Sequence, residues 1–224
     1  MVRPGMRIDI WSDIACPWCY LGLTRLAKAL DGFEHAGQVD VRLHSFQLDP
    51  SLPDHFDGSE AEYLARSKGL DLATVHQMTA RVAAAAAGDG LTYDFDALVV
   101  ANSRRAHRLL QLAGQRSERT AWDLELALFE AHFTDGRDVN DADTLVELAK
   151  SVGLEADAAR EAIDSGERDA EVTADVLSAG ELGIQGVPFF VLAGKYGISG
   201  AQPLELFEGA LRQVWDELQP QAVS

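Results

Sequence analysis

The sequence predicts an α/β fold in which a large all-helical region interrupts a small sheet. Three observations along the chain support this fold class. The chain opens with a strand, a helix and a second strand; strand patterns almost vanish between Gly58 and about Gly183; two strands and a last helix then close the chain. Because the helices begin and end inside one sheet-forming unit, they are predicted to be an insertion and not a second domain joined by a linker.

The opening unit has the pattern β-α-β. Residues 7–12 (RIDIWS) alternate in polarity and are β-prone, which predicts a strand. Leucine and alanine at helical spacing between positions 21 and 30 predict a helix, and the alternation over 39–46 predicts a second strand. Strands joined through a helix in this way are parallel, with a right-handed crossover.

The middle of the chain is predicted to be helical. Helical spacing recurs in segments that glycine or aspartate separates, namely 59–68, 72–87, 95–113, 118–133, 141–151 and 156–182. Residues 58–183 are therefore predicted to form an inserted helical domain. Residues 1–57 and 184–224 are predicted to form the two halves of one discontinuous domain.

The closing unit has the pattern β-β-α. Strand character returns at 187–192, a turn follows at 193–195, and a second strand is predicted at 196–199 before a helix over 204–218. The full order of elements matches a thioredoxin-like fold with a large all-helical domain inserted between the N-terminal β-α-β and C-terminal β-β-α units.

Cys16 and Cys19 are the only two cysteines, and they lie where the first strand gives way to the helix. Pro17 suits the first helical position, since its missing N–H is not needed there. The unpaired N–H groups and the dipole at a helix start favour a thiolate, and Cys16 lies closer to them. Cys16 is therefore the predicted attacking sulfur, and Cys19, one turn further in, the resolving one.

Redox chemistry is favoured for this pair over a zinc site and over an inert pair. A structural zinc site takes four ligands, and the six histidines include no pair spaced three or four apart. A disulfide between Cys16 and Cys19 would close too small a loop to add much stability. We therefore expect no metal, and we interpret His107 and His132, which lie in helical segments, as structural residues.

Charge and composition exclude several classes of partner. With 19 basic and 36 acidic residues the formal charge is −17, which repels nucleic acid and anionic membranes. The chain has no run of about 18 apolar residues that would span a bilayer. Residues 1–7 lead into a charged strand without the apolar core of a secretory signal, so a cytoplasmic protein with mostly reduced cysteines is expected.

Three sequence blocks carry a family resemblance. They are 12–22 (SDIACPWCYLG), 183–191 (GIQGVPFFV) and 198–203 (ISGAQP), and their order and spacing extend over essentially the full chain. With them the chain resembles the DsbA-like thioredoxin superfamily and, within it, the FrnE-like oxidoreductases. The resemblance implies a thiol:disulfide oxidoreductase that acts on a disulfide or dithiol substrate, protein or small molecule, and holds no bound cofactor.

The resemblance also implies roles for Val187 and Pro188. Pro188 would form a cis peptide bond that faces the dithiol, and cis bonds are almost confined to X-Pro pairs. The backbone N–H and C=O of Val187 would then be free to pair with an extended substrate peptide beside Cys16. The sequence alone favours the alternative, a trans proline at the entry of the strand.

Trp18 and Asp13, which lie next to the cysteines in the sequence, are also expected to affect the redox chemistry. Trp18 replaces the histidine found between the cysteines of periplasmic DsbA oxidants, so a weaker oxidant is expected, and its ring is a candidate for substrate binding. Asp13, three residues before Cys16, is a candidate proton acceptor for Cys19. In the alternative, Asp13 only ends the strand through a side-chain-to-backbone hydrogen bond.

A second function class involves glutathione. The 2-hydroxychromene-2-carboxylate isomerases and kappa-class glutathione transferases share the fold and the helical insertion, and they carry a serine in the place of Cys16. The intact cysteine pair favours redox chemistry here, with glutathione as a redox substrate whose backbone would pair with Val187 and Pro188. The positions expected to receive its γ-glutamyl end are Ser199, Gly200, Ala201 and Gln202.

Two further interpretations stay open from the sequence. In a redox-inactive binding module, the helical domain would dock a partner without turnover of any disulfide. The oligomeric state is also open, and a leucine-rich helical face is a candidate interface for a homodimer. That pattern includes Leu124, Leu126, Leu128 and Phe129.

Overall fold

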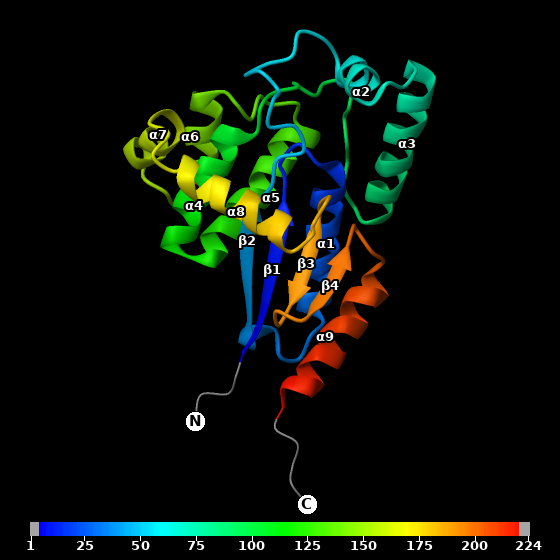
Figure 1. Cartoon of the computed structure of the whole chain (residues 1–224), viewed down its shortest axis with the longest axis vertical. Coiled ribbons are helices and arrows are strands. Elements are labelled where there is room, and N and C mark those ends of the chain that lie inside the picture. The colour runs from blue at the N-terminus through cyan, green and yellow to red at the C-terminus, as the bar shows by residue number, and fades with distance from the viewer. Residues whose placement is uncertain (1–4, 220–224) are drawn as a thin grey trace, which may run out of the picture.

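The computed structural model describes residues 5–219, with a four-stranded mixed sheet at its centre (Figure 1). The strands are β1 (Met6–Ser12), β2 (Val39–Ser45), β3 (Phe189–Leu192) and β4 (Tyr196–Ser199). They lie in the order β2-β1-β3-β4. Because β1 is parallel to β2 and antiparallel to β3, the first strand joins the opening and closing units of the chain.

Helices cover the sheet, and in Figure 1 α8 passes in front of it while α1 lies behind it. The helices are α1 (Pro17–Asp31), α2 (Glu60–Lys68), α3 (Leu72–Gly88), α4 (Arg104–Arg116), α5 (Glu118–Phe133), α6 (Ala142–Ser151), α7 (Ala156–Asp164), α8 (Asp169–Glu181) and α9 (Leu204–Leu218). The predicted order of a β-α-β unit, a run of helices and a β-β-α unit is confirmed. Along residues 5–219 no helix combines the length and the apolarity needed to cross a membrane.

The predicted helix over 95–113 is wrong in its first part, because α4 begins only at Arg104. The preceding segment includes an isolated β-bridge in which Ala101 pairs with His55. Pairing with the loop after β2 therefore overrides the apolar spacing that predicted a helix there.

The predicted helix over 156–182 divides into α7 and α8. Gly166 lies at the break with a φ of 71°, a left-handed conformation that glycine adopts without steric penalty. The division lets α8 lie against β2 while α7 packs on α4 and α6.

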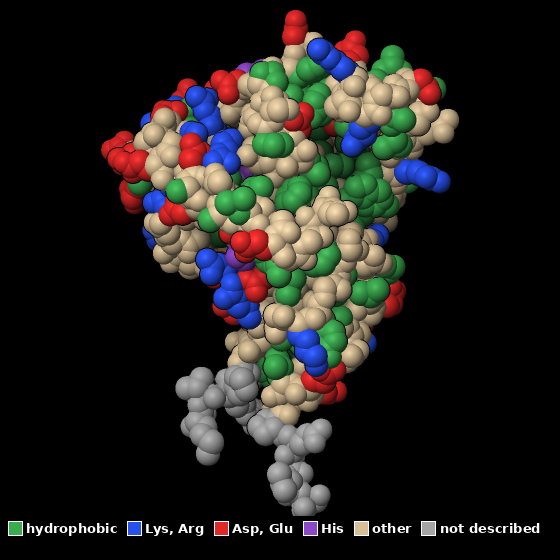
Figure 2. All heavy atoms as spheres, in the orientation of Figure 1, with side chains coloured by type: hydrophobic (Ala, Val, Ile, Leu, Met, Phe, Trp, Pro, Cys, Tyr) green, Lys and Arg blue, Asp and Glu red, His purple; other side chains and the backbone are tan. Residues whose placement is uncertain are grey.

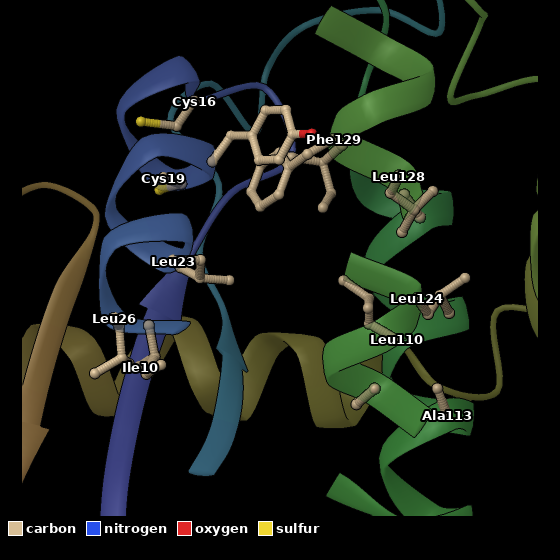
Figure 3. Packing of buried hydrophobic residues seen from close by; sticks show 14 of the residues in the cluster. Ile10, Cys16, Cys19, Leu23, Leu26, Leu110, Ala113, Leu124, Leu128 and Phe129 are labelled. Atoms are coloured by element: carbon tan, nitrogen blue, oxygen red, sulfur yellow. The ribbon is translucent and has the colours of Figure 1, made fainter. Parts of the chain in front are cut away.

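One hydrophobic core extends through both parts of the chain (Figure 3). It joins Ile10 of β1 and Leu23 of α1 to Leu110 of α4 and Leu128 of α5. The inserted helices therefore complete the core that the sheet begins. The predicted domain boundaries at 57/58 and 183/184 stay a prediction, and the terminal residues 1–4 and 220–224 lie outside the described part of the chain.

The helical face expected to support a homodimer points inward. Leu124, Leu128 and Phe129 are fully buried, and Leu126 is half-buried against the same core. These side chains pack within the chain, so they do not offer the interface that the pattern was expected to support. The homodimer itself stays a prediction without this support.

Candidate active site

The dithiol lies at the junction of β1 and α1, as predicted. In the turn after the strand, the N–H of Cys16 donates to the carbonyl of Asp13 at 2.9 Å, and Cys16 takes the N-cap position of α1. Pro17 is the first helical residue, where its missing N–H breaks no helical hydrogen bond. Figure 3 shows Cys16 and Cys19 on the first turns of α1, at the positive end of its dipole.

The two thiols differ in their access to solvent. Both are free, but Cys16 is 4% exposed and borders a cleft, whereas Cys19 is fully buried and does not line it. Burial raises the pKa of the Cys19 thiol well above its ordinary value, and the neighbouring Cys16 raises it further. A substrate in the cleft therefore meets the Cys16 sulfur, while Cys19 keeps its proton behind it.

The cleft beside Cys16 has a volume of about 600 Å³. Its walls come from the turns after β1 and β2, from α2 and α3, and from the segment before α4. Apolar side chains dominate, and Figure 2 shows them gathered in the hollow between α3 and the body of the molecule. Trp18 lines the cleft and is 41% exposed, and its role in substrate binding stays a prediction.

The loop before β3 faces the dithiol. The Val187–Pro188 peptide bond is cis, as the family resemblance implied, and the Sγ atom of Cys16 lies 3.5 Å from the carbonyl oxygen of Val187. The Pro188 ring packs directly on Gly22 of α1, where a Cβ atom would come within 2.9 Å of Pro188 Cγ. The structure therefore brings Cys16, Val187 and Pro188 together.

The segment expected to receive the γ-glutamyl end of glutathione lies next to Pro188. The N–H of Gly200 donates to the carbonyl of Pro188 at 2.8 Å, and Nη1 of Arg25 donates to the carbonyl of Ala201 at 2.8 Å. None of its four residues, Ser199, Gly200, Ala201 and Gln202, lines the cleft. In the structure this segment supports the Pro188 loop, and its role toward glutathione stays a prediction.

Asp13 is buried and accepts three hydrogen bonds. Its carboxylate accepts from the N–H of Leu48 at 2.7 Å, from the N–H of Ala15 at 3.3 Å and from Nε2 of His107 at 3.2 Å. Burial by itself would raise the pKa of Asp13, but the bonds from His107 and Leu48 hold it below its ordinary value. A carboxylate stabilised in its ionised form is a weak acceptor for the Cys19 proton, so the geometry favours the strand-ending role.

Sequence reasoning missed an acidic residue behind the dithiol. Glu125 of α5 is 1% exposed, and burial raises the pKa of its carboxyl to about 7, while Ser12 and His107 act in the opposite direction. The signal was present in the sequence. Glu125 follows Ala121 by four residues and precedes Phe129 by four, so it shares their buried helical face.

The inserted helices hold the start of α1 in place. The hydroxyl of Tyr93, in the loop between α3 and α4, donates to the carbonyl of Pro17 at 2.7 Å. The ring of Tyr20 stacks on the rings of Tyr93 and Phe129, with centroids 5.8 and 5.3 Å apart. The helical insertion therefore fixes the turn that carries the dithiol.

Comparison with known proteins relates this site to a family. The family model of the DsbA-like thioredoxin domain matches residues 7–212. The crystal structure of a probable DsbA oxidoreductase from Streptomyces coelicolor is 40% identical, with a TM-score of 0.88, over 98% of this chain and 94% of that one. No match was found among the curated proteins.

Two more distant structures share the fold. A 2-hydroxychromene-2-carboxylate isomerase is 17% identical with a TM-score of 0.72, over 94% of this chain and 97% of that one. The cytosolic disulfide reductase DsbM from Pseudomonas aeruginosa is 21% identical with a TM-score of 0.64, over 94% of this chain and 99% of that one. At these identities the likeness shows the fold alone. The family model and the relative from Streptomyces show more: the chain belongs to the DsbA-like thioredoxin domain family, whose members are thiol:disulfide oxidoreductases.

Proposed function

We propose that this protein is a cytoplasmic thiol:disulfide oxidoreductase of the FrnE-like type that works through Cys16 and Cys19. The observation that carries the proposal is the placement of the pair. Cys16, at the N-cap of α1, borders the cleft, and Cys19 is buried one turn behind it. An attacking thiol needs access to its substrate, whereas a resolving thiol needs access only to the attacking sulfur.

In the proposed reaction the Cys16 thiolate attacks one sulfur of a substrate disulfide, and the other sulfur leaves as a thiolate that takes a proton from solvent. Cys19 then loses its proton and attacks the Cys16 sulfur of the mixed disulfide. The Cys16–Cys19 disulfide forms, and the second substrate sulfur leaves. The substrate is reduced to two thiols while the enzyme dithiol is oxidised, and the reverse sequence oxidises a dithiol substrate.

The cleft and the loop at Pro188 support a substrate with a peptide backbone. The carbonyl of Val187 lies beside the Cys16 sulfur, so an extended segment that pairs with this loop brings its own sulfur to Cys16. Glutathione disulfide and a protein disulfide both meet this requirement. The distant fold relative DsbM has been solved with GSH, and we propose glutathione disulfide as a redox substrate here.

The proposal includes a cytoplasmic location. In that compartment the glutathione and thioredoxin systems keep a dithiol reduced and able to attack. The distant fold relative DsbM is described as cytosolic. Alkylation of thiols in intact source cells, followed by fractionation, is expected to recover the protein in the cytoplasmic fraction with both cysteines labelled.

Trapping the mixed disulfide tests the proposed function. The Cys19→Ser protein is expected to retain a glutathione adduct on Cys16 after mixing with glutathione disulfide, because the resolving thiol is missing. The parent protein is expected to pass through this adduct to the internal disulfide. Cys16→Ser is the matched control and should form neither species in a mass spectrum. If neither the parent nor the Cys19→Ser protein forms an adduct or an internal disulfide, glutathione disulfide is not a substrate. If insulin, a reducible protein, gives the same negative result, the proposed function is wrong.

The same proteins separate redox chemistry from the other two classes. A glutathione-dependent isomerase keeps glutathione as an intact thiolate and does not need Cys16. Isomerisation of a chromene carboxylate by Cys16→Ser, without disulfide turnover by the parent, would assign the protein to the isomerase class. Neither isomerisation nor disulfide turnover would indicate a binding module.

A further inference from the structure

A second cavity lies mainly between β2, α4 and α5, and it shares no lining residue with the cleft beside Cys16. Its volume is about 400 Å³, whereas a water molecule in the liquid occupies roughly 30 Å³. We call it the rear cavity. The lining residues that define it here are Ser12, Arg42, His107, Gly114, Glu118 and Glu125. The rear cavity is therefore large enough for a small organic molecule.

Three buried polar side chains border the rear cavity with an atom that has no hydrogen-bond partner among residues 5–219. These atoms are Ser12 Oγ, His107 Nδ1 and Glu125 Oε1, and each of the three residues is 1% exposed. Folded proteins pair the large majority of such atoms. Residues 5–219 hold five unpaired buried side-chain atoms in all, and three of the five border this one cavity. Their concentration there indicates a binding site.

Three separate elements bring these atoms to the rear cavity. Ser12 ends β1, and its neighbour Asp13 accepts a hydrogen bond from Nε2 of His107 on α4 at 3.2 Å. Glu125 lies on α5, which packs along α4 and against β2. Ala121, one turn before Glu125, also lines the cavity, so this face of α5 forms one of its walls. The position of each atom is therefore fixed by a different packed element.

All three atoms accept hydrogen bonds. The Asp13 carboxylate only accepts, so Nε2 of His107 carries the hydrogen of their bond, and Nδ1 of the neutral ring keeps a lone pair. The Ser12 hydroxyl oxygen and the ionised carboxylate of Glu125 also have lone pairs. An ammonium group has three N–H donors and no acceptor, which matches a set of three acceptors. A water molecule has only two donors.

The charges that line the rear cavity favour a cation. Three of the lining residues are glutamates, and one is an arginine. Glu118 already lies 4.0 Å from Arg42, and Glu171 lies 3.2 Å from Arg168. Glu125 pairs with no lysine or arginine in the described part of the chain. A buried carboxylate without a counter-ion is unfavourable, and a bound cation compensates its charge.

The other lining residues narrow the kind of cation. Along residues 5–219, no group of three histidine, cysteine, aspartate or glutamate side chains could hold a metal ion. Leu43, Leu110 and Ala121 give the rear cavity apolar surface beside its acceptors. Such a surface suits a short alkyl chain, while a few polar groups fix the orientation of the ligand. The walls therefore suit an alkylammonium ion better than a bare metal ion.

The rear cavity reaches the molecular surface. Arg42 and Glu118 line it, and their side chains are 50% and 35% exposed. Buried Glu125 and this exposed pair border the same space. A small molecule therefore reaches Glu125 from solvent without unfolding of the chain.

We propose that the rear cavity binds a small aliphatic primary amine in its ammonium form, with N–H groups that donate to Ser12 Oγ, His107 Nδ1 and Glu125 Oε1. The alkyl chain packs on Leu43 and Leu110. This inference goes beyond the proposed function and does not depend on it, since neither cysteine lines the rear cavity.

Calorimetric titration with n-butylammonium chloride tests the site. Burial raises the pKa of Glu125 to about 7, so at about pH 8 its carboxylate is ionised, while the amine keeps its proton as a lysine side chain does. The parent is expected to bind one equivalent in a saturable way and to gain thermal stability as the amine concentration rises. A folded parent that binds no butylammonium would overturn the proposal, because the rear cavity would then hold water alone.

Three analogues separate hydrogen bonding from charge and from apolar contact. Butyltrimethylammonium keeps the charge without an N–H donor, 1-butanol keeps the alkyl chain without the charge, and butyrate reverses the charge. Each is expected to bind at least about tenfold more weakly than butylammonium, as the loss of charged hydrogen bonds predicts. Equal binding of butyltrimethylammonium would indicate diffuse attraction to a chain of net charge −17 and would overturn the proposal. Equal binding of 1-butanol would overturn it too.

Two variants place the binding in the rear cavity. Glu125→Gln removes the charge at nearly constant size and is expected to bind butylammonium at least about tenfold more weakly. Its matched control is Glu130→Gln, an exposed change on the same helix. A Cβ at Gly114 meets no atom within 4 Å, so Gly114→Leu fills the cavity while the three acceptors stay, and it should abolish binding. Gly209→Leu, at an equally open position on α9, is the control for that change.

Each outcome decides the proposal, whether or not Glu125→Gln folds. Parent-like affinity in a folded Glu125→Gln or Gly114→Leu protein would overturn it, and the analogues give their answer on the parent alone. A crystal structure of the butylammonium complex should place the nitrogen within about 3.2 Å of the three acceptors, and a ligand bound elsewhere would overturn the assignment. A parent that binds the amine but turns over no disulfide would support the amine site and reject the proposed function. A parent with the opposite behaviour would reject the amine site alone.

Discussion

His107 of the inserted helix α4 donates a hydrogen bond to Asp13, in the turn that leads to the dithiol, over 3.2 Å and with both side chains 1% exposed. The bond joins two segments that are 94 positions apart in the sequence. It holds the helical insertion against the redox turn and keeps the Asp13 carboxylate ionised in a buried place. Removal of the histidine would leave that charge without its main partner.

We predict that His107→Leu lowers the free energy of unfolding by about 3 kcal/mol at pH 7, as expected for a buried pair that loses one partner. The folded-state pKa of Asp13 lies below its unfolded value, so its contribution is present above about pH 4 and is lost as the pH falls through the folded value. Urea unfolding should therefore show a difference between the proteins that shrinks in acid. Equal stability at pH 7 would contradict the prediction.

A partly buried histidine, His44, makes stability depend on pH in the opposite sense. His44 lies between two carboxylates, with Nδ1 2.7 Å from Asp175 Oδ1 and Nε2 2.8 Å from Asp9 Oδ1. Burial by itself would lower the pKa of His44, but the bonds to Asp175 and Asp9 raise it. The stabilisation is fully present below the unfolded pKa of about 6.5 and is lost as the pH rises through the folded value.

We therefore predict that the parent protein loses stability from about pH 6.5 into the alkaline range, and that His44→Gln removes this component of the pH dependence. Urea unfolding at several pH values measures both curves. His55→Gln serves as the control, because His55 is half exposed where it pairs with Asp138. If the free energy of unfolding had the same pH dependence in the parent and in His44→Gln, the prediction for His44 would be wrong.

Close packing of α1 on the Pro188 loop predicts sensitivity at Gly22. A Cβ there would lie 2.9 Å from Pro188 Cγ and 3.2 Å from Phe190 Cζ, so Gly22→Ala should lower the free energy of unfolding by about 1–3 kcal/mol. It should also slow substrate capture, because the loop moves away from Cys16. Gly209→Ala, where the added Cβ meets nothing within 4 Å, is expected to gain up to about 1 kcal/mol. Similar results for both variants would contradict the packing argument.

The unequal burial of the two thiols predicts unequal alkylation. In Cys16→Ser, the remaining Cys19 thiol should react slowly with iodoacetamide at neutral pH, because it is fully buried and its pKa is raised. In Cys19→Ser, the remaining Cys16 should react faster, since it borders the cleft. Mass spectrometry over time measures both rates, and the reverse order would exchange the roles of the two sulfurs.

The residue between the cysteines predicts the redox potential. Without a histidine there, the potential should fall between about −270 mV for thioredoxin and about −120 mV for DsbA. Trp18→His should raise it, because an imidazolium beside Cys16 stabilises the thiolate and with it the reduced form. Trp18 is 41% exposed, so the exchange disturbs little packing. Equilibration with glutathione buffers gives both potentials, and an unchanged or lower value in Trp18→His would contradict the explanation.

Local signals were sufficient for the part of the site that lies on contiguous chain. The alternation before Cys16 and the helical spacing after it each depend on a few neighbouring residues, and the structure has the strand and the helix where the sequence predicts them. At Pro188 the sequence alone favoured a trans bond and was wrong, since the Val187–Pro188 bond is cis, as the family resemblance implied. The position of these elements does not test the binding roles that were predicted, such as the role of Gln202 in receiving the γ-glutamyl end of glutathione.

Contacts between distant segments could not be predicted in this way. His107 meets Asp13, and Glu125 shares a cavity with Ser12, only because α4 and α5 pack against β2. No local sequence pattern predicts which of these buried polar groups lie together. The segment ending at Ala101 failed as a helix for the same reason, since its partner His55 is far away in the sequence.

The pairing of β1 with β3, in which Ile8 lies opposite Leu192, has a consequence for synthesis of the chain. A ribosome releases the N-terminus first, so Cys16 and Cys19 emerge long before the strand that completes the sheet. Until then the carbonyl of Val187 is not beside Cys16, and the nascent dithiol is open to any oxidant or thiol in its surroundings. The time needed to translate the helical insertion therefore sets how long the newborn chain remains vulnerable to wrong disulfides.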